Sequence, residues 1–326
     1  CFGNSVEGCY LHDLGGGGIH LGSMDIPEDE ARHLSRNNKF DNNILRSGSR
    51  VFPTGVGIIV FNASDNQITH NDISDFFYTG VSVGWVWGYS HSPSVRNIIN
   101  YNHIHHIGWG VLSDMGGIYT LGDSRGSEIC FNHVHHIYSL TYGGWGIYPD
   151  EGTTGILIEN NLVHHCKSSG FHQHYGKDNI IRNNIFVNNL LAQMEATRVE
   201  PDHLPFTFSN NIIQYESGKM YGINWDKVNF TADENLYWNT KGSVTWNDST
   251  LTAWQKQTGK DLHSIIENPQ FKDIDNGDFT IGNKAAIEKI HFKPFDYTQA
   301  GVYGNESWKK LAGFDPKRHT LYQSIV

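Results

Sequence analysis

The sequence of 326 residues contains only four cysteines: Cys1, Cys9, Cys130 and Cys166. No two of them have the spacing of a zinc finger or a redox motif, and nothing in their arrangement indicates a disulfide framework. We therefore expect them to be small apolar core residues. The sequence also lacks an apolar stretch long enough to span a bilayer, so we predict no membrane insertion.

Positive charge is scarce. The chain has 24 Lys and Arg residues against 34 Asp and Glu residues, which gives a formal net charge of −10. Long-range repulsion disfavours nucleic acid, an anionic membrane or a polyanionic glycan as a partner. Charged residues make up only 18% of the chain, whereas glycine is frequent at 35 residues. This combination indicates a glycine-rich β architecture rather than a helical one.

A motif that contains Asn recurs along the chain, as in NNIL, HNDI, YNHI, FNHV and NNLV. GCYL at residue 8 looks like an earlier copy, with Cys9 in the position of the Asn. Successive copies that contain the Asn lie 23 to 31 residues apart, which is typical of coils of fixed size with loop insertions. The aligned asparagines are Asn43, Asn71, Asn102, Asn132, Asn161, Asn184, Asn211 and Asn235.

Between these motifs, apolar and polar residues alternate, as in ITHNDI and GVSVG, with the period of β-strands. Short strands that a repeat stacks on one another predict a solenoid. One Asn per coil can form a ladder of side-chain amides, so we expect a structural role for this column. We predict an all-β fold over residues 1–240, a right-handed parallel β-helix of about nine coils. The chain starts without a Met and apparently inside a repeat, so we expect upstream sequence to be missing.

The repeat fades after Asn235. The stretch STLTAWQKQTGK predicts a short helix, with Ser249 or Asp248 as the N-cap and Gly259 at its end. The segments that follow look irregular or like short β-strands. Because the open end of a solenoid has to be covered, we predict that residues 241–326 form a C-terminal cap rather than an independent domain.

Histidines are frequent in three consecutive copies of the repeat, HIHHI, HVHHI and VHHC. Columns of histidines can bind metal. However, stacked imidazoles at a repeated position follow from the repeat alone, so we predict no metal and no cofactor. The repeat stacks these residues in two columns: His105, His135 and His164, and His106, His136 and His165.

One strand in each coil follows a glycine, as in GIHLG, GVSVG, GIYTL, GIYPD and GFHQH, and LAQME continues the series. Because side chains alternate across a strand, the residues two and four positions after the glycine should point outward. Aromatic rings there could stack on sugars, and carboxylates and imidazoles could bind hydroxyls. The first predicted outward column is His20, Ser82, Tyr119, Tyr148, His172 and Gln193, and the second is Gly22, Gly84, Leu121, Asp150, His174 and Glu195.

Two acids border this face on consecutive coils, Asp114 in SDMGGIYTLG and Asp150 in GIYPDEG. Glycoside hydrolysis uses one carboxyl group to protonate the leaving oxygen and another to attack or to activate water. The alternative is that each acid caps its own turn. We predict Asp114 and Asp150 as the catalytic acids, with Glu151 in reserve. The predicted substrate-binding residues are Tyr119, Trp145, Tyr148, His172, His174, Glu195 and Arg198.

The stretches DMGGIYTLG, GIYPDEG and GFHQHYGKDNIIRNNIF resemble the β-helix proteins around glycoside hydrolase family 141, and more distantly family 120. Family 141 pairs an Asp-x-Gly-Ala/Gly-Ile-Tyr motif with a Tyr-x-Asp-Asp/Glu-Gly motif, and includes α-L-fucosidase and xylanase activities. The resemblance implies that Asp114 and Asp150 are the catalytic pair. The chain departs from the family at Glu151, which replaces its second Asp, and in TLGDSRG after Tyr119.

The leading prediction is a secreted or periplasmic glycoside hydrolase that acts on a plant or algal polysaccharide or oligosaccharide. The first rival is a polysaccharide lyase, which needs a cation or a basic cluster at the uronate carboxylate; Arg182, Lys177 and Arg198 are available for it. The second rival is a glycan-binding or structural β-helix without catalysis, since a solenoid fold alone does not imply an activity.

Overall fold

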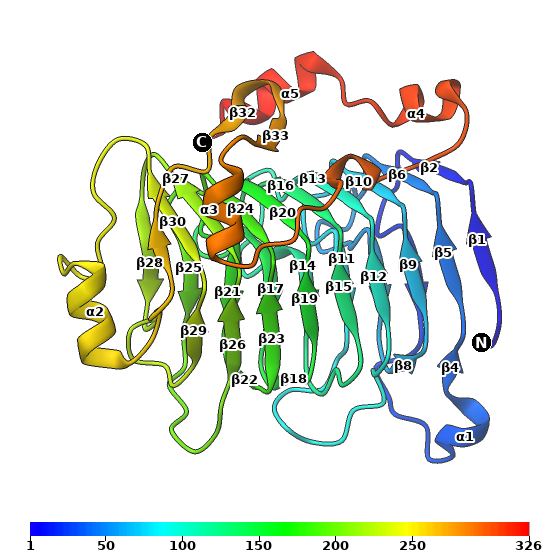
Figure 1. Cartoon of the computed structure of the whole chain (residues 1–326). Helices are drawn as coiled ribbons and strands as arrows, with labels where there is room; N and C mark the ends of the chain where they lie inside the picture. The colour runs from blue at the N-terminus through cyan, green and yellow to red at the C-terminus, as the bar shows by residue number, and fades with distance from the viewer. Residues whose placement is uncertain (326) are drawn as a thin grey trace.

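The computed structural model describes residues 1–325, and its short strands stack into three long parallel sheets (Figure 1). The first sheet contains β1 (Ser5–Glu7), β5 (Lys39–Asp41), β9 (Gln67–Thr69), β12 (Ile98–Asn100), β15 (Glu128–Cys130), β19 (Leu157–Glu159), β23 (Asn179–Arg182), β26 (Phe206–Ser209) and β29 (Thr231–Asp233). The second contains β2 (Tyr10–His12), β6 (Ile44–Arg46), β10 (Asp72–Ser74), β13 (His103–Ile107), β16 (His133–Ile137), β20 (Leu162–Cys166), β24 (Ile185–Val187), β27 (Ile212–Tyr215), β30 (Leu236–Asn239) and β31 (Ile265–Ile266). The third contains β3 (Ile19–Leu21), β7 (Ile58–Val60), β11 (Val81–Val83), β14 (Gly116–Thr120), β17 (Trp145–Pro149), β21 (Phe171–Gln173), β25 (Ala192–Ala196) and β28 (Lys219–Ile223).

The chain visits the three sheets in the same order in each of the first eight coils, and each strand pairs in parallel with its counterpart one coil away. Nine strands in the first sheet correspond to nine coils. The predicted parallel β-helix is therefore confirmed. Short parallel pairs also lie at the corners between sheets, namely β4 (Ser35–Arg36) with β8 (Ala63–Ser64), and β18 (Thr153–Thr154) with β22 (Gly176–Lys177).

The core fills the interior of the coil with stacked apolar side chains. In the third sheet, one inward column is continuous through six coils, and its members are fully buried: Ile58, Val81, Ile118, Ile147, Phe171 and Met194. Each such side chain contributes about 1.5–3 kcal/mol by leaving water. Cys130 and Cys166 belong to the buried residues, but Cys1 and Cys9 are exposed, so the expectation of core cysteines is wrong for those two.

Asn side chains form the predicted ladder at the corner between the first and second sheets. Each side-chain amide donates to the Oδ1 of the next ladder Asn at 2.9–3.2 Å, from Asn43 through to Asn235. The backbone N–H of Cys9 donates to Asn43 Oδ1 at 2.9 Å, which confirms Cys9 as an earlier copy. A second ladder was not predicted; it runs through Asn4, Asn38, Asn66 and Asn97.

The segment after β30 divides into two parts. The helix α2 (Leu251–Thr258) lies at the C-terminal end of the solenoid, where its Trp254 joins the core (Figure 1). Its N-cap is Thr250 rather than Ser249 or Asp248, because the Thr250 side chain accepts the N–H of Ala253 at 3.3 Å. Gly259 ends the helix in the left-handed conformation, as predicted.

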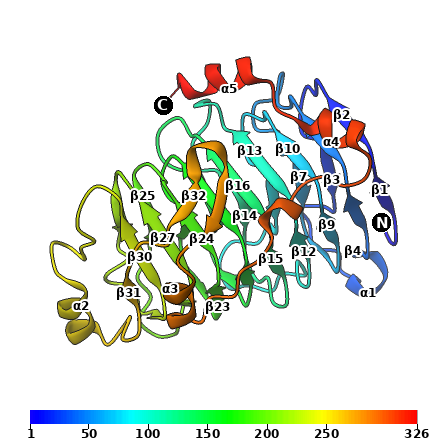
Figure 2. The same cartoon turned by 45° about the horizontal axis from the view of Figure 1, so that its top comes forward.

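The rest of the C-terminal segment turns back along the outer face of the second sheet (Figures 1 and 2). We call residues 267–325 the C-terminal strap. Its elements are an antiparallel pair, β32 (Phe271–Asp273) and β33 (Asp278–Ile281), followed by α3 (Lys284–Lys289), α4 (Glu306–Ala312) and α5 (Pro316–Gln323). Apolar strap residues such as Phe279 and Ile287 pack on Leu162 and Ile185 of the sheet. Within residues 241–325, the part around α2 covers the open end, whereas the strap covers a side.

The strap reaches far back along the solenoid. Arg46 of β6 donates to the carbonyl of Ala312 at 2.6 Å, and the hydroxyl of Tyr303 donates to Asp41 at 2.8 Å.

A further helix, α1 (Glu30–His33), lies on an early loop. No helix among residues 1–325 is long and apolar enough to cross a membrane.

Candidate functional site

A cleft of about 820 Å³ lies on the outer face of the third sheet. Its floor comes from strands β7, β11, β14, β17 and β21, and loops before and after these strands form its walls. Three acids line it together with aromatic side chains and two histidines: Asp114, Asp150 and Glu151; Phe61, Tyr78, Trp85, Trp87, Tyr119, Tyr142, Trp145 and Tyr148; and His172 and His174. The predicted outward face is therefore a concave, aromatic site.

The register of the third sheet tests the two predicted columns. Ser82, Tyr119 and Tyr148 are paired neighbours, as expected. His172 pairs with Glu195, so Glu195 rather than Gln193 continues the first column, and the second column passes to Thr197. The prediction of Gln193 was therefore wrong by two residues. The inward residue of β25 that pairs with Phe171 is Met194. It also omitted the coil that contains Ile59.

Asp150 follows β17 directly and is buried, with 6% of its surface exposed. The Tyr119 hydroxyl donates to its Oδ2 at 2.6 Å, and Nδ1 of His174 lies 2.9 Å from its Oδ1. Burial by itself raises the pKa of this carboxyl group, but the hydrogen bonds from His174, Tyr119 and Tyr148 outweigh burial and hold it below its ordinary value. Asp150 is thus ionised, and its partner His174 has a raised pKa because of the same hydrogen bond.

Asp114 lies on the loop before β14, in a left-handed conformation with φ of 54°. Its backbone is held by Tyr78, whose hydroxyl donates to the Asp114 carbonyl at 2.9 Å, and its Oδ1 accepts the Tyr148 hydroxyl at 3.1 Å. Burial and the negative charge of Asp150 raise the pKa of Asp114 above its ordinary value. The two carboxyl groups on adjacent coils therefore have pKa values displaced in opposite directions.

Trp145 lines the cleft next to these acids. Its ring stacks on the ring of His172 at 4.0 Å between centroids, and its Nε1–H donates to Glu195 Oε2 at 2.6 Å. Glu195 is buried and also accepts the Ser169 hydroxyl, and burial raises its pKa. Glu195 does not line the cleft, so it holds Trp145 in place from below.

Glu151 and Arg198 lie farther from the centre of the site. Glu151 lines the cleft, and its Oε2 accepts the Tyr175 hydroxyl at 2.8 Å. The Arg198 guanidinium lies over the Tyr175 ring at 4.3 Å and does not line the cleft. Arg182 pairs with Glu159 on the first sheet at 2.7 Å. The described residues that line the cleft include no Lys or Arg, so the basic cluster that a lyase needs is not in it.

Sequence reasoning missed several aromatic residues of the cleft, namely Tyr78, Trp85, Trp87 and Tyr142. All four lie on loops rather than on strands. Trp85 stacks edge-on against Trp87 at 5.4 Å and against Phe61 at 4.9 Å, and Trp87 is 55% exposed. The signal in the sequence was the run WVWGY directly after the strand GVSVG, because aromatic residues in a loop beside a predicted face point to a binding site.

No protein-family model and no curated protein matches the chain. Among solved structures, a glycoside hydrolase is 25% identical over 56% of this chain with a TM-score of 0.46, and the chain covers 31% of its length. The Dettilon tailspike protein is 15% identical over 82% of this chain with a TM-score of 0.44, and 62% of its length is covered. These low TM-scores carry no argument about function, and the resemblance to families 141 and 120 stays an expectation.

Proposed function

We propose that the protein is a glycoside hydrolase with Asp114 as the general acid and Asp150 as the nucleophile or general base. The observation that carries this proposal is the placement of two carboxyl groups in one aromatic cleft on adjacent coils, in surroundings that displace their pKa values in opposite directions. A pair of acids whose environments separate their pKa values is the arrangement that acid–base chemistry on a glycosidic bond requires.

The other residues of the cleft have supporting roles in this proposal. Tyr119 and His174 hold the Asp150 carboxylate in place through its two oxygens. Tyr148 donates to Asp114 and contributes to the lowered pKa of Asp150, so its hydroxyl lies between the two acids. Trp145, Trp85 and Trp87 supply flat surfaces for sugar rings.

The composition of the lining narrows the substrate class. No Lys or Arg lines the described cleft, and the imidazole of His174 is already paired with Asp150. No unpaired positive charge among the described lining residues is therefore left to neutralise a uronate, and an uncharged sugar suits the cleft better. We propose a neutral poly- or oligosaccharide of plant or algal origin as the substrate. Such a substrate lies outside the cell, which agrees with the expected secreted or periplasmic location.

Hydrolysis of a panel of aryl glycosides and of plant and algal glycans tests the proposal. On a substrate that the wild-type protein cleaves, Asp150→Asn and Asp114→Asn should each lower kcat/KM by about 10²- to 10⁴-fold. The loss in Asp114→Asn should be smaller when the leaving group is an acidic phenol, because such a group departs without a proton. The loss in Asp150→Asn should be independent of the leaving group.

Asp178→Asn is the matched control, because Asp178 is exposed and has a left-handed φ of 55° close to that of Asp114. It should retain wild-type activity. Turnover at the wild-type rate in Asp150→Asn would contradict the assignment. Binding of glycans without any turnover would replace hydrolysis by a binding function, and an unsaturated uronate product would show a lyase.

A further inference from the structure

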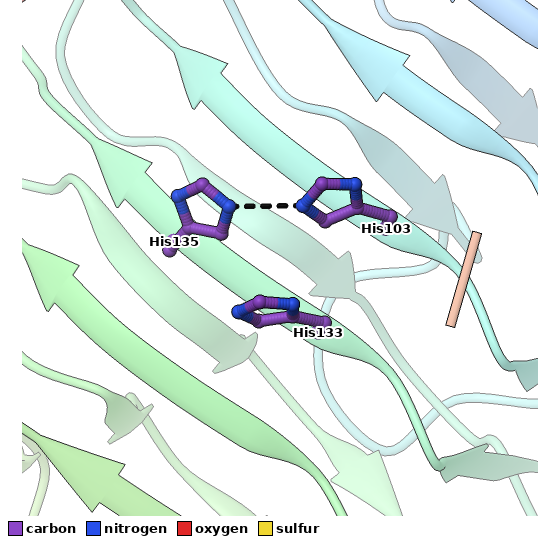
Figure 3. Close-up of side chains that lie close together, drawn as sticks. All are labelled: His103, His133 and His135. Carbon is purple, nitrogen blue, oxygen red and sulfur yellow. Dashed lines mark hydrogen bonds between the residues drawn. The ribbon is translucent and has the colours of Figure 1, made fainter. Parts of the chain in front are cut away.

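Histidine side chains gather on the outer face of the second sheet, away from the cleft on the third sheet. Three of them are half-buried and close together: His103 on β13, and His133 and His135 on β16 (Figure 3). We call these three residues the histidine triad. The hydrolysis proposed above uses none of them.

The backbone explains why the triad converges. His133 and His135 are two residues apart on one strand, so their side chains leave the same face. His103 is the direct neighbour of His133 on the adjacent strand. One ring nitrogen from each residue lies within 4.8 Å of those of the other two. The Nε2 atoms of His103 and His135 are 2.9 Å apart, the contact drawn as a dashed line in Figure 3.

The distances between these ring nitrogens are close to those between ligand atoms that bind one metal ion. Zn²⁺ binds imidazole nitrogen at about 2.0–2.1 Å in a tetrahedron, which places two ligand nitrogens about 3.4 Å apart. A small rotation of the His103 and His135 rings would reach that spacing. Three imidazoles with one open position is also the donor set of a common type of zinc site.

The outer nitrogens of the triad have partners that orient the rings. The Nδ1–H of His103 donates to Asp72 Oδ2 at 3.0 Å, which leaves a lone pair on the Nε2 that faces His135. Nδ1 of His135 lies 2.6 Å from Nδ1 of His136. A carboxylate behind a metal-binding imidazole fixes its tautomer and makes it a better ligand.

One carboxylate oxygen of Asp72 lacks a hydrogen bond. The carboxyl group is buried, with 3% of its side chain exposed, and its Oδ1 has no hydrogen bond. Arg46 approaches that oxygen only to 3.5 Å. A buried carboxylate oxygen without a hydrogen bond favours a further positive charge nearby. A divalent ion at the triad would supply that charge.

The triad is open to small solutes. A cavity of about 350 Å³ reaches His103 and His135 between the sheet and the strap residues Ala300–Val302 and Ala312–Phe314. On the other side, the Tyr297 ring lies 6.2 Å from the His133 ring. An ion could enter through the cavity, and water could occupy the remaining coordination position.

We propose that His103, His133 and His135 bind one divalent transition-metal ion, Zn²⁺ or an ion of the same ligand preference. Imidazole nitrogens select such ions, whereas Mg²⁺ and Ca²⁺ prefer oxygen. The ion joins two successive coils beneath the C-terminal strap. The sequence favoured a purely structural column, because the repeat explains the stacking but does not contain the inter-ring distances.

Calorimetry and elemental analysis on the tag-free full chain, stripped with EDTA and titrated with ZnCl₂ alone, test this proposal. One equivalent of Zn²⁺ should bind, and MgCl₂ should give no heat. Co²⁺ should produce the visible absorption of a nitrogen-ligated tetrahedral site. His133→Gln should weaken Zn²⁺ binding by about 100-fold or more, because one of three protein ligands is lost.

His165→Gln is the matched control, because it removes an imidazole outside the triad and should retain wild-type affinity. His164→Gln instead tests the neighbouring cluster of His135, His136 and His164, since His164 Nε2 lies 2.8 Å from His133 Nε2. If His164→Gln loses binding while His133→Gln keeps it, the ion belongs to a different cluster and the proposal is wrong. Absence of stoichiometric Zn²⁺ binding by the wild-type chain would equally overturn it, and would mean that the triad is a neutral hydrogen-bonded network.

A second variant separates ligand loss from unfolding. Asp72→Asn keeps all three imidazoles and should weaken binding about 10- to 100-fold, because the orientation of His103 is disturbed and the negative charge behind it is lost. Each variant is compared by circular dichroism and thermal melting without metal, and Zn²⁺ should raise the melting temperature of the wild type. If both Asp72→Asn and His133→Gln bind Zn²⁺ with wild-type affinity, the assignment is wrong. These measurements do not involve glycoside hydrolysis.

Discussion

At the scale of single residues, the contacts of Asp150 determine what the cleft can do. Its carboxylate is buried, yet it receives hydrogen bonds from Tyr119 and His174 that keep it ionised. Asp114, which lacks an equivalent cationic partner and faces the charge of Asp150, holds its proton to higher pH. Two chemically identical side chains thus acquire different roles from the residues beside them.

The displaced pKa values predict the pH dependence of hydrolysis. Asp150 has to be ionised, so the rate should fall as the pH drops through its lowered pKa. Asp114 has to be protonated, so the rate should also fall as the pH rises through its raised pKa. We expect a bell-shaped profile of kcat/KM with its maximum on the acidic side, and a rate that rises continuously into alkaline pH would contradict the roles.

His174→Phe should move chiefly the acid limb of this profile. The variant keeps a ring but removes the hydrogen bond that contributes most to lowering the pKa of Asp150, so the acid limb should move to higher pH. Tyr175→Phe is the matched control, because Tyr175 donates to Glu151 and not to Asp150. A shift in Tyr175→Phe with none in His174→Phe would favour Glu151 over Asp150 as the ionised acid.

At the scale of elements, the Asn ladder joins each coil to the next. Asn132 accepts hydrogen bonds from the backbone N–H and the side-chain amide of Asn102, and its own amide donates to Ile99 and Asn161. All of these groups are buried, so each has to be paired inside the protein. The ladder therefore satisfies the backbone at a corner where no strand pairing is available.

Asn132→Ala should destabilise the fold by about 2–4 kcal/mol, because it leaves buried donors and acceptors on neighbouring coils without partners. The midpoint of urea denaturation measures this loss. Asn229→Ala, on an exposed residue outside the ladder, should change stability by less than about 0.5 kcal/mol. Equal effects of the two substitutions would show that the ladder hydrogen bonds of Asn132 do not stabilise the fold.

At the scale of the whole molecule, the C-terminal strap turns one face of an open solenoid into a second apolar core. Near its end, the buried Tyr322 donates to the carbonyls of Ile107 and His136, each at 2.6 Å. These carbonyls belong to adjacent coils. The strap thus contacts the solenoid over many coils rather than at its end alone.

Tyr322→Phe should lower the stability of the protein by about 1–3 kcal/mol, because two buried carbonyls lose their shared donor. Thermal melting measures the loss, and hydrogen exchange should show faster exchange in α5. Leu321→Ala, on the neighbouring residue that is 58% exposed, should have little effect. If both variants melt at the wild-type temperature, the strap end adds no stability.

Periodicity along the chain was sufficient to predict the coil, the ladder from Asn43 to Asn235, the stacked histidines and the outward direction of Tyr119, Tyr148 and Asp150. These features repeat, and a repeat of strands has one way to bury its apolar face. The same reasoning failed at Gln193, because a shift of two residues changes the alignment without changing the alternation. It also failed for Trp85 and Tyr142, which lie on insertions that have no repeat.

The sequence by itself therefore determined the solenoid and the face that carries the acids, because both follow from local alternation of side chains. Only the tertiary structure decided the direction of each pKa shift, the return of the strap along the second sheet and the convergence of His103, His133 and His135. Each of these depends on distances between side chains of different coils. Such distances are set when insertions and the non-repeating C-terminal segment pack against the stack, and no periodicity encodes them.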